Sequence, residues 1–507
     1  MSTVTGGPQI VRTGLILDLD ASSANSYGPI KAEVLVVAGG GAGGGYHGGG
    51  GGAGGVLYTS NYTIVRNTTY TVTVGLGGAG ANANSNTGDP GQNSIFSGAS
   101  TVLTAVGGGA GKSQGNATAA RNNGGSGGGG CDGNSSSITG GSGTAAQGFN
   151  GGDVSGESGG SLAVYYGTAG GGGAGGVGGT GGIVNGGFGG PGLPFSISGT
   201  TQYYGGGGGG TNLTNVLEYG IGGIGGGGTG GVSPSPHNSP LRYSTNGSAN
   251  TGGGGGGYLY SGHGGGSGGS GIVIIRYKGP QKATGGTITT VGTETVHTFT
   301  SSGTFVTGTN FIDLSGNNNN GTIDGPTFNS ANGGSIVFDG TNDFVSISSL
   351  ASFNFGSAMS VFVWHKNIGG DYRGVIANTY GGGGFDLRYG REDFFGGGNN
   401  GTILNVYINT SSGTFSRSIN AELNVWGNYG FTYTGSSLIA YKNGVSFSTI
   451  SASGNVSVTS NSVIIGKNLV GSEFLSGNVA IVFVYNRALS ALEIMQNFQA
   501  TKTRFGL

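Results

Sequence analysis

Residues able to do chemistry are few in this chain and lie far apart. The one cysteine is Cys131, and the five histidines are His47, His237, His263, His297 and His365. A zinc site needs thiolate or imidazole ligands at a fixed short spacing, so this scatter predicts none. His365 follows Trp364 in a predicted strand, and we interpret it as a structural residue.

Paired carboxylates could catalyse glycoside hydrolysis, which uses two of them, one on either side of the scissile bond. The nearest cluster lies in a turn-rich stretch and comprises Asp386, Glu392 and Asp393, beside Arg388 and Arg391. We interpret it as ordinary surface ion pairs. The Gly-x-Gly-x-x-Gly pattern is also frequent, but glycine this abundant produces it by chance, without the strand–turn–helix order that phosphate binding needs. The sequence predicts no enzyme.

Oxygen-bearing side chains are the remaining candidates for metal chemistry, because calcium takes six to eight oxygen ligands. They are Asp339, Asn342 and Asp343, in the segment FDGTNDF. Asp339-Gly340 and Asn342-Asp343 are also ordinary turn dipeptides, and turns are the interpretation we favour. Calcium is therefore the one cofactor considered, and none is required.

The longest region of unusual composition is a glycine-rich stretch from about Lys31 to Gly279. It holds 88 of the chain's 126 glycines and only 13 charged residues among its 249. It opens on the apolar segment 33–37 and closes on 271–277, both typical of strands, and aromatic residues separate its glycine runs. This composition indicates a folded domain rather than a flexible linker.

Glycine runs such as 205–210 can fold through their main chain. A polyproline II-like helix makes no internal hydrogen bonds and points every N–H and C=O outward. Without Cβ atoms, several such rods can lie side by side and bond to one another. Collagen is excluded, because there is no sustained Gly-X-Y period and the chain has only 10 prolines.

From Asn310 onward the pattern is that of an all-β sandwich, with short strands separated by Gly, Asn and Ser turns. The segment Ser490-Ala491-Leu492-Glu493 is a capping box and predicts a helix. We expect Leu492, Ile494 and Phe498 to face the sheet.

A strand is also predicted near the N-terminus, at 14–20, where apolar and polar residues alternate. Its two carboxylates, Asp18 and Asp20, could suggest a metal site, but solvent-side strand carboxylates are the interpretation we favour.

The glycine-rich stretch carries a resemblance. EVLVVAGGGAGGG, TYTVTVGLGGAG and GGSGGSGIVIIRY resemble the glycine-rich domain of viral and phage appendage proteins. They are also similar to the polyglycine II sandwich of some phage tail-fibre adhesins and, more distantly, to a region of certain receptor tyrosine kinase ectodomains. In the adhesins, glycine rods form a rigid block and loops at its end contact the host. The resemblance implies contact through aromatic loop residues, with these candidates: Tyr165, Tyr166, Tyr203, Tyr204, Tyr258 and Tyr260. His263 could lie at an exposed tip, although we favour turn packing for it.

A second resemblance covers about 310–507 plus 14–28. GLILDLDASSANSYG, IDLSGNNNNGTI, GGSIVFDGTNDFVSI and FLSGNVAIVFVYNRALSALEIMQNF resemble a laminin G-type, concanavalin A-like lectin/glucanase jelly roll. Many such sandwiches hold calcium at the sheet rim, which is a second reason to consider Asp339, Asn342 and Asp343. The ending NFQATKTRFGL is similar to cyanophage and marine-virus structural proteins.

The two resemblances together imply an insertion. In relatives of the sandwich, GLILDLDA runs almost directly into DLSGNGNNGT, whereas here the glycine-rich stretch separates them. We predict an all-β protein, a concanavalin A-like jelly-roll sandwich with an inserted glycine-rich domain of short strands and polyglycine II helices. Residues 1–30 form an N-terminal segment and first strand, 31–279 the insert, 280–309 a connecting β-hairpin, and 310–507 the sandwich with its C-terminal helix.

Composition limits the function. The formal net charge is −1 and 8% of residues are charged, so no basic surface is available to nucleic acid. No run of about 18 apolar residues is present, which excludes membrane insertion by a helix. The N-terminus lacks a secretory signal, although the composition is that of an extracellular module.

A virion protein, made in the host cytoplasm and released at lysis, reconciles these observations. Secretion without a cleaved signal is the alternative. The resemblances imply a tail-fibre or capsid-fibre adhesin on the virion surface. Its partners would be other virion proteins, further copies of the chain, and host-surface glycans or envelope proteins. A purely structural decoration or fibre-forming protein remains open, as does a secreted carbohydrate-active enzyme.

Overall fold

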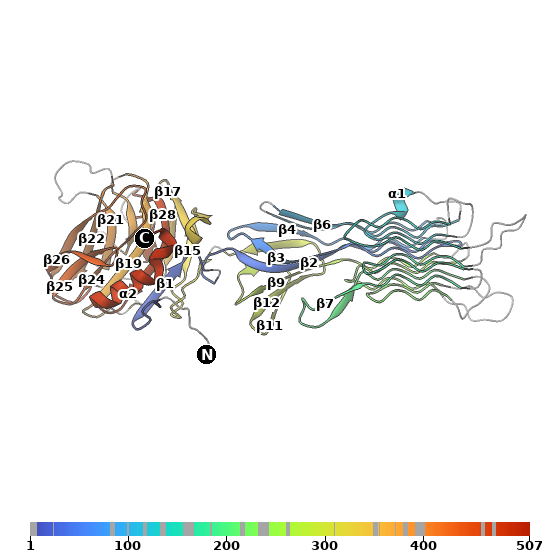
Figure 1. The fold of residues 1–507 in the computed structure, drawn as a ribbon, viewed down its shortest axis with the longest axis horizontal. Coiled ribbons are helices and arrows are strands. Elements are labelled where there is room, and N and C mark those ends of the chain that lie inside the picture. The colour runs from blue at the N-terminus through green and yellow to red at the C-terminus, as the bar shows by residue number, and fades with distance from the viewer. Residues whose placement is uncertain are drawn as a thin grey trace, which may run out of the picture. The chain divides into compact units, whose positions relative to one another are not determined.

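The computed structural model describes residues 8–23, 25–81, 87–98, 101–114, 119–131, 138–155, 167–182, 185–212, 219–231, 243–259, 264–308, 310–347, 353, 355–370, 372–378, 384–390, 401–457, 462–468 and 473–507 (Figure 1). The chain forms two compact units, one made of residues 1–29 with 309–507 and the other of 30–308. The sheets of both units are antiparallel, and the chain belongs to the all-β class, as the sequence predicts. None of the helices described is long and apolar enough to cross a membrane.

The first unit is a two-sheet sandwich. In the described residues its first sheet has the order β16-β17-β28-β19-β24-β25-β26, with β1 added beside β28. The strands are β1 Leu15–Asp20, β16 Thr327–Asn329, β17 Ser335–Asp339, β19 Met359–Asn367, β24 Gly427–Tyr433, β25 Ser437–Lys442, β26 Val445–Ser451 and β28 Ser476–Tyr485. The second sheet has the order β14-β15-β18-β27-β20-β21-β22-β23. Its strands are β14 Asn310–Phe311, β15 Gly321–Asp324, β18 Phe344–Ile347, β20 Gly374–Ala377, β21 Gly384–Tyr389, β22 Ile403–Thr410, β23 Gly413–Asn420 and β27 Val463–Ile465.

One core fills the space between these sheets. Alternate residues of each strand contribute to it, such as Val361 and Val363 of β19 and Leu404 and Val406 of β22, all 0% exposed. Because side chains alternate across a strand, the residues between them must face outward from each sheet. The two outer faces differ sharply in character.

The C-terminal helix α2, Ala491–Thr501, covers the outer face of the first sheet (Figure 1). Its capping box forms as predicted: the Ser490 hydroxyl accepts from the Glu493 N–H, and the Glu493 carboxylate accepts from the Ser490 N–H. Ile494 and Phe498 pack on the sheet. The prediction was wrong for Leu492, which is 84% exposed, because two helical residues turn the chain about 200° from one face to the other.

The outer carboxylates of β1 are also not at the solvent side. Asp18 is 2% exposed, and its Oδ2 accepts from Arg12 Nη1 at 2.9 Å. Burial raises the pKa of Asp18 to about 6, against the lowering effect of Arg12. Asp20 Oδ1 accepts from Arg504 Nη1 at 2.6 Å. These partners are unpredictable from strand alternation, because Arg504 stands near the far end of the chain.

The second unit combines two five-stranded sheets with a block of glycine rods. One sheet has the order β11-β12-β9-β2-β3 and the other β10-β13-β4-β5-β6. The strands of the first are β2 Ile30–Val37, β3 Val56–Ile64, β9 Ile272–Lys278, β11 Thr287–Val291 and β12 Glu294–Phe299. Those of the second are β4 Thr69–Thr73, β5 Ser94–Gly98, β6 Thr101–Ala105, β10 Ala283–Thr284 and β13 Gly303–Thr307. A small hairpin, β7 Leu193–Phe195 with β8 Gln202–Tyr204, packs on the outer face of the first.

Residues 280–309 do not form a separate connecting hairpin: they contain the hairpin β11–β12, which belongs to the first sheet of this unit. β12 pairs with β9 in one sheet, whereas β13 pairs with β4 in the other. The Ser-Ser-Gly turn between them therefore crosses from sheet to sheet, and Phe299 and Phe305 are both buried in the core between the sheets. This segment belongs to the glycine-rich unit, whose last residue is Gly308.

The glycine runs lie side by side as extended rods (Figure 1). The central rod, residues 48–55, bonds to six others through three successive glycines. Gly50, Gly51 and Gly52 donate to the carbonyls of Ala169, Gly255 and Gly109, and accept from the N–H groups of Gly129, Gly208 and Gly41, at 2.8–3.0 Å. A rod with six bonded neighbours is packed hexagonally, as the central rod is here. Backbone bonding between polyglycine II-like rods therefore replaces a side-chain core in this block, as predicted.

Candidate ligand-binding face

The outer face of the second sheet is polar. In β21, Phe385, Leu387 and Tyr389 enter the core, so Asp386 and Arg388 face outward. In β22, Leu404, Val406 and Ile408 enter the core in the same way. We call the outward residues of the two strands the polar face: Asp386, Arg388, Asn405, Tyr407 and Asn409.

Asp386 is the most unusual residue of the polar face. Its side chain is buried, with the residue 4% exposed, and its Oδ1 has no hydrogen-bond partner among the described residues. Its Oδ2 lies 3.6 Å from Arg388 Nε. Burial raises the pKa of Asp386 to about 7, and the carboxylate of Glu473 adds to the rise while Arg388 opposes it. Near neutral pH this carboxyl therefore changes between a hydrogen-bond donor and an acceptor.

Arg388 and Tyr407 stand beside it. The Arg388 guanidinium carbon lies 4.7 Å from the centre of the Tyr407 ring, a cation–π distance. Tyr407 is directly opposite Asp386 across the β21–β22 pair. The stacked ring and guanidinium form a flat surface with N–H donors along its edge.

The strands beside Asp386 carry small residues at the positions opposite the Asp386–Tyr407 pair. Asp386 pairs with Ala377 of β20, and the strand beyond Tyr407 contributes Ser416. The Asn405 Oδ1 accepts from the hydroxyl of Ser418, its neighbour in β23, at 2.7 Å.

Two further buried polar atoms of the sandwich lack a partner among the described residues. Asn468 donates its Nδ2 to Glu473 Oε2 at 2.7 Å, but its Oδ1 has no partner in the described part of the chain. Arg373 donates its Nη1 to the carbonyl of Phe474 at 2.8 Å, and its Nε is likewise without a partner there. An unbonded buried polar atom costs about 1–3 kcal/mol. Asp386 Oδ1 and these two atoms are therefore energetically unfavourable unless a group outside the described residues bonds to them.

The structure corrects the interpretation of the acidic cluster as surface ion pairs. Asp386 and Arg388 face each other in a buried strand position, with side chains 5% and 13% exposed. Glu392, Asp393 and Arg391 lie outside the described residues. His365 is structural as predicted: it is 0% exposed, and its Nε2 bonds to the Tyr389 hydroxyl at 2.8 Å.

The tyrosines predicted for host contact do not gather in the described part of the chain. Tyr203 is 40% exposed, whereas Tyr204 and Tyr258 are 5% and 1% exposed. Tyr204 packs on the outer face of the β11-β12-β9-β2-β3 sheet. The remaining candidates, Tyr165, Tyr166, Tyr260 and His263, lie outside the described residues. The loop-contact prediction thus stays a prediction.

The candidate calcium residues make a turn between β17 and β18. Asp339 Oδ1 accepts from the N–H of Thr341 at 2.7 Å and of Asn342 at 3.4 Å. Asp343 Oδ2 accepts from the Asp339 N–H at 2.9 Å. Among the described residues no cluster of three or more metal-binding side chains occurs. Both carboxylates are therefore engaged with the backbone, which does not fit a cage of six to eight oxygens.

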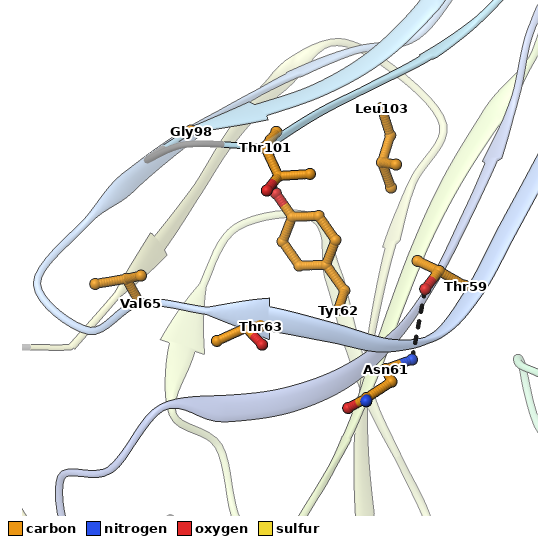
Figure 2. Close-up of a pocket in the computed structure, with 8 residues that line it drawn as sticks. All are labelled: Thr59, Asn61, Tyr62, Thr63, Val65, Gly98, Thr101 and Leu103. Carbon is orange, nitrogen blue, oxygen red and sulfur yellow. Dashed lines mark hydrogen bonds between the residues drawn. The ribbon is translucent and has the colours of Figure 1, made fainter. Parts of the chain in front are cut away.

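A hollow of about 350 Å³ lies on the second unit between β3 and the strands β5 and β6 (Figure 2). The Tyr62 hydroxyl donates to the Thr101 carbonyl at 2.7 Å, and the Asn61 N–H to Thr59 Oγ1 at 3.5 Å. The lining is threonine, asparagine, tyrosine, valine, leucine and glycine, without a charged group. The polar face, in contrast to this hollow, presents carboxyl, guanidinium, carboxamide and phenol groups.

Together, fold and site define an all-β protein that combines a lectin-like sandwich with a glycine lattice. The chain belongs to the glycine-rich domain family, which matches residues 22–278. The concanavalin A-like lectin/glucanase superfamily matches residues 339–495. No curated protein sequence matches the chain.

Solved structures match at low identity. One is the binding domain of Paraclostridial Mosquitocidal Protein 1, at 16% identity and a TM-score of 0.31, covering 37% of this chain and 48% of that one. Another is the binding domain of Botulinum Neurotoxin DC in complex with SialylT, at 11% and 0.31, covering 38% and 48%. A third is domain 4 of an extracellular arabinanase from Geobacillus stearothermophilus in complex with arabinotriose, at 16% and 0.30, covering 36% and 91%. The chain spans about half the length of the first two structures.

Proposed function

We propose that this protein attaches a virion to its host, with the lectin-like sandwich binding surface glycans through the polar face. The glycine lattice would serve as a rigid scaffold in a tail-fibre or capsid-fibre appendage. The observation that carries the binding proposal is the buried Asp386 carboxyl beside the Arg388–Tyr407 stack, with an Oδ1 that no described residue bonds.

The chemistry of the polar face suits a glycan. A sugar presents hydroxyl groups, which both donate and accept, and a ring face lined by C–H groups. Carboxyl, guanidinium and carboxamide groups supply the matching acceptors and donors. Tyr407 supplies an aromatic surface for the ring face, since aromatic side chains combine apolar area with a polar tip. Only 8% of the residues are charged, so few other charged side chains are available to bind a polar ligand.

Glycan-array binding by the full chain tests the proposal, followed by titration calorimetry with the best ligand. Tyr407→Ala should weaken binding about tenfold or more, as loss of a central aromatic contact does. Phe447→Ala is the matched control, because Phe447 is an aromatic residue 46% exposed on β26 of the other sheet. Equal affinities of the two variants would refute binding at the polar face.

The virion location needs its own experiment. Immunogold labelling of purified particles with antibodies against the sandwich should decorate a fibre or the capsid surface. Antibodies against the loop around Tyr203 and the predicted loop around Tyr260 should reduce adsorption to host cells. Labelled particles whose adsorption is unaffected by every antibody would favour the decoration role instead.

A second candidate function is glycoside hydrolysis. Asp386 has the raised pKa of a general acid, and Glu473 is a second carboxylate close enough to contribute to that rise. We propose binding without hydrolysis, because Glu473 is engaged by the Asn468 carboxamide. Incubation with algal polysaccharides should release no new reducing ends. Their release by the wild type but not by Asp386→Asn would establish the enzyme.

A further inference from the structure

The glycine lattice has one outer layer with an apolar surface. It consists of three rods, residues 176–181, 186–192 and 220–224, which we call the outer row. Gly179 donates to the Phe188 carbonyl, and Gly189 and Gly192 donate to the carbonyls of Ile221 and Ile224, at 2.7–2.9 Å. The three rods are therefore bonded edge to edge in this order.

The outer row lies on a second, inner pair of rods. Gly187 and Gly190 of the middle rod donate to Thr168 and Gly171, at 2.9 Å. The other inner rod bonds to the same two residues, because Gly210 and Gly207 donate to the carbonyls of Gly187 and Gly190. The middle rod thus has four bonded neighbours, where the central rod of the block has six. The two missing neighbours belong to the side facing away from the block.

Large apolar side chains occupy that outward side. Val177, Phe188, Ile221 and Ile224 are 62%, 60%, 56% and 56% exposed. Phe188 and Pro191 are three residues apart, as are Ile221 and Ile224, which is the repeat of a polyproline II rod. The period places these side chains on one face, and the described residues of the three rods include no charged side chain.

These side chains prevent the lattice from growing by another layer of rods. Within the block a Cβ added to a glycine would lie about 2 Å from a neighbouring carbonyl, as at Gly189 with 1.9 Å to Gly207. A rod at lattice distance from the outer row would meet the same conflict with Phe188 or Ile221. Any partner must pack against the side chains and not against the backbone.

We propose that the outer row is an interface with a second copy of this chain. The four side chains expose on the order of 400 Å² of apolar surface, and Pro191, Thr180 and the glycine backbone between them extend it. A standard interface buries about 800 Å² per partner, so the four side chains alone would supply about half of the area that such a dimer buries. A second copy offers an equally flat and uncharged surface with the same spacing, so two such faces pack without leaving a charge unpaired.

The opposite side of the block supplies a control. Leu76 is 60% exposed on the rod 75–80. The rods 39–44, 48–55 and 168–173 separate it from the outer row, as the bonds Gly78–Gly40, Gly41–Gly52 and Gly50–Ala169 show. Substitution of Leu76 changes the exposed apolar area without touching the proposed interface.

Sedimentation equilibrium of the full chain over a wide concentration range tests the proposal, independently of glycan binding. The wild type should self-associate reversibly. Phe188→Asn and Ile221→Asn should each weaken association at least about tenfold, whereas Leu76→Asn should leave it unchanged. Thermal unfolding of all three variants must match the wild type, which excludes misfolding as the cause.

Two outcomes would overturn the assignment. The first is a wild type that stays monomeric at every concentration. The second is association that Phe188→Asn and Leu76→Asn affect equally. If the wild type is monomeric and Phe188→Asn abolishes attachment to cells, the outer row receives a foreign partner instead.

Discussion

A Cβ atom placed on Gly50 would lie 2.1 Å from the carbonyl oxygen of Gly208. Rods of the block approach one another closely enough to exclude every side chain at such positions. Backbone bonds in six directions become possible only because the side chain is a hydrogen atom. The same closeness makes the block intolerant of substitution.

Gly50→Ala should therefore destabilise the glycine-rich unit severely. The added methyl group meets backbone atoms, which cannot move aside without breaking their own bonds, so we expect a loss of at least about 3 kcal/mol. Differential scanning calorimetry should show the transition of this unit shifted down and that of the sandwich unchanged. Gly303→Ala is the control, because its nearest contact is the Phe299 ring at 3.8 Å. A Gly50→Ala transition equal to that of Gly303→Ala would argue against close rod packing.

The buried Asp386 carboxyl should make the stability of the sandwich depend on pH. Its pKa is about 7 in the folded chain and 3.8 as the model value for the unfolded chain. As the pH rises from about 4 to 7, the unfolded chain loses this proton first, so the unfolded state is favoured and stability falls. Below pH 4 and above pH 7 this group adds no further pH dependence.

Asp386→Asn should remove that part of the pH dependence. The variant should be more stable than the wild type at pH 8, by an amount on the order of a few kcal/mol. Denaturant unfolding of the sandwich at pH 4 and pH 8 measures the difference. Asp18, whose pKa is raised to about 6, should leave a smaller dependence in both proteins. A wild type that gains stability between pH 4 and 7 would contradict the burial of Asp386.

The sandwich should fold without the glycine-rich unit. The Ile312 N–H donates to the Ser26 carbonyl at 3.2 Å, and the Leu314 N–H to Asp18 at 2.8 Å. The segments that flank the insertion are therefore hydrogen-bonded to each other, and a short linker can join them. Replacement of residues 30–308 by a few Gly and Ser residues should give a soluble domain with cooperative unfolding and a β-type circular dichroism spectrum. An unfolded or aggregated product would mean that the sandwich depends on the insert.

Much of the fold was predictable because the local signals were strong. Alternation around Met359–His365 and the Asn443-Gly444 turn identify β19 and the β25–β26 hairpin, where both turn residues have positive φ. The segment Phe385-Asp386-Leu387-Arg388-Tyr389 also alternates, although it lies in a turn-rich stretch of the sequence. Recognition of that period would have placed Asp386 and Arg388 on one face.

Other features leave no trace in the sequence. Which glycine run bonds to which cannot be predicted, because the runs have nearly the same composition and no side chains to distinguish them. The burial of Asp386 depends on strands far apart in the chain, as does the contact of Asp20 with Arg504. The crossing of β12 and β13 between sheets likewise depends on Phe299 and Phe305 reaching a shared core.

Hydrogen exchange tests most directly whether a hydrogen-bonded backbone holds the glycine-rich unit together. Peptides from residues 39–56 should be protected from exchange to nearly the same degree as the β19 strand, because Gly50, Gly51 and Gly52 each donate a bond inside the lattice. Exchange of these amides at the rate of an unfolded peptide would contradict the account, and the unit would then be a tether and not a scaffold.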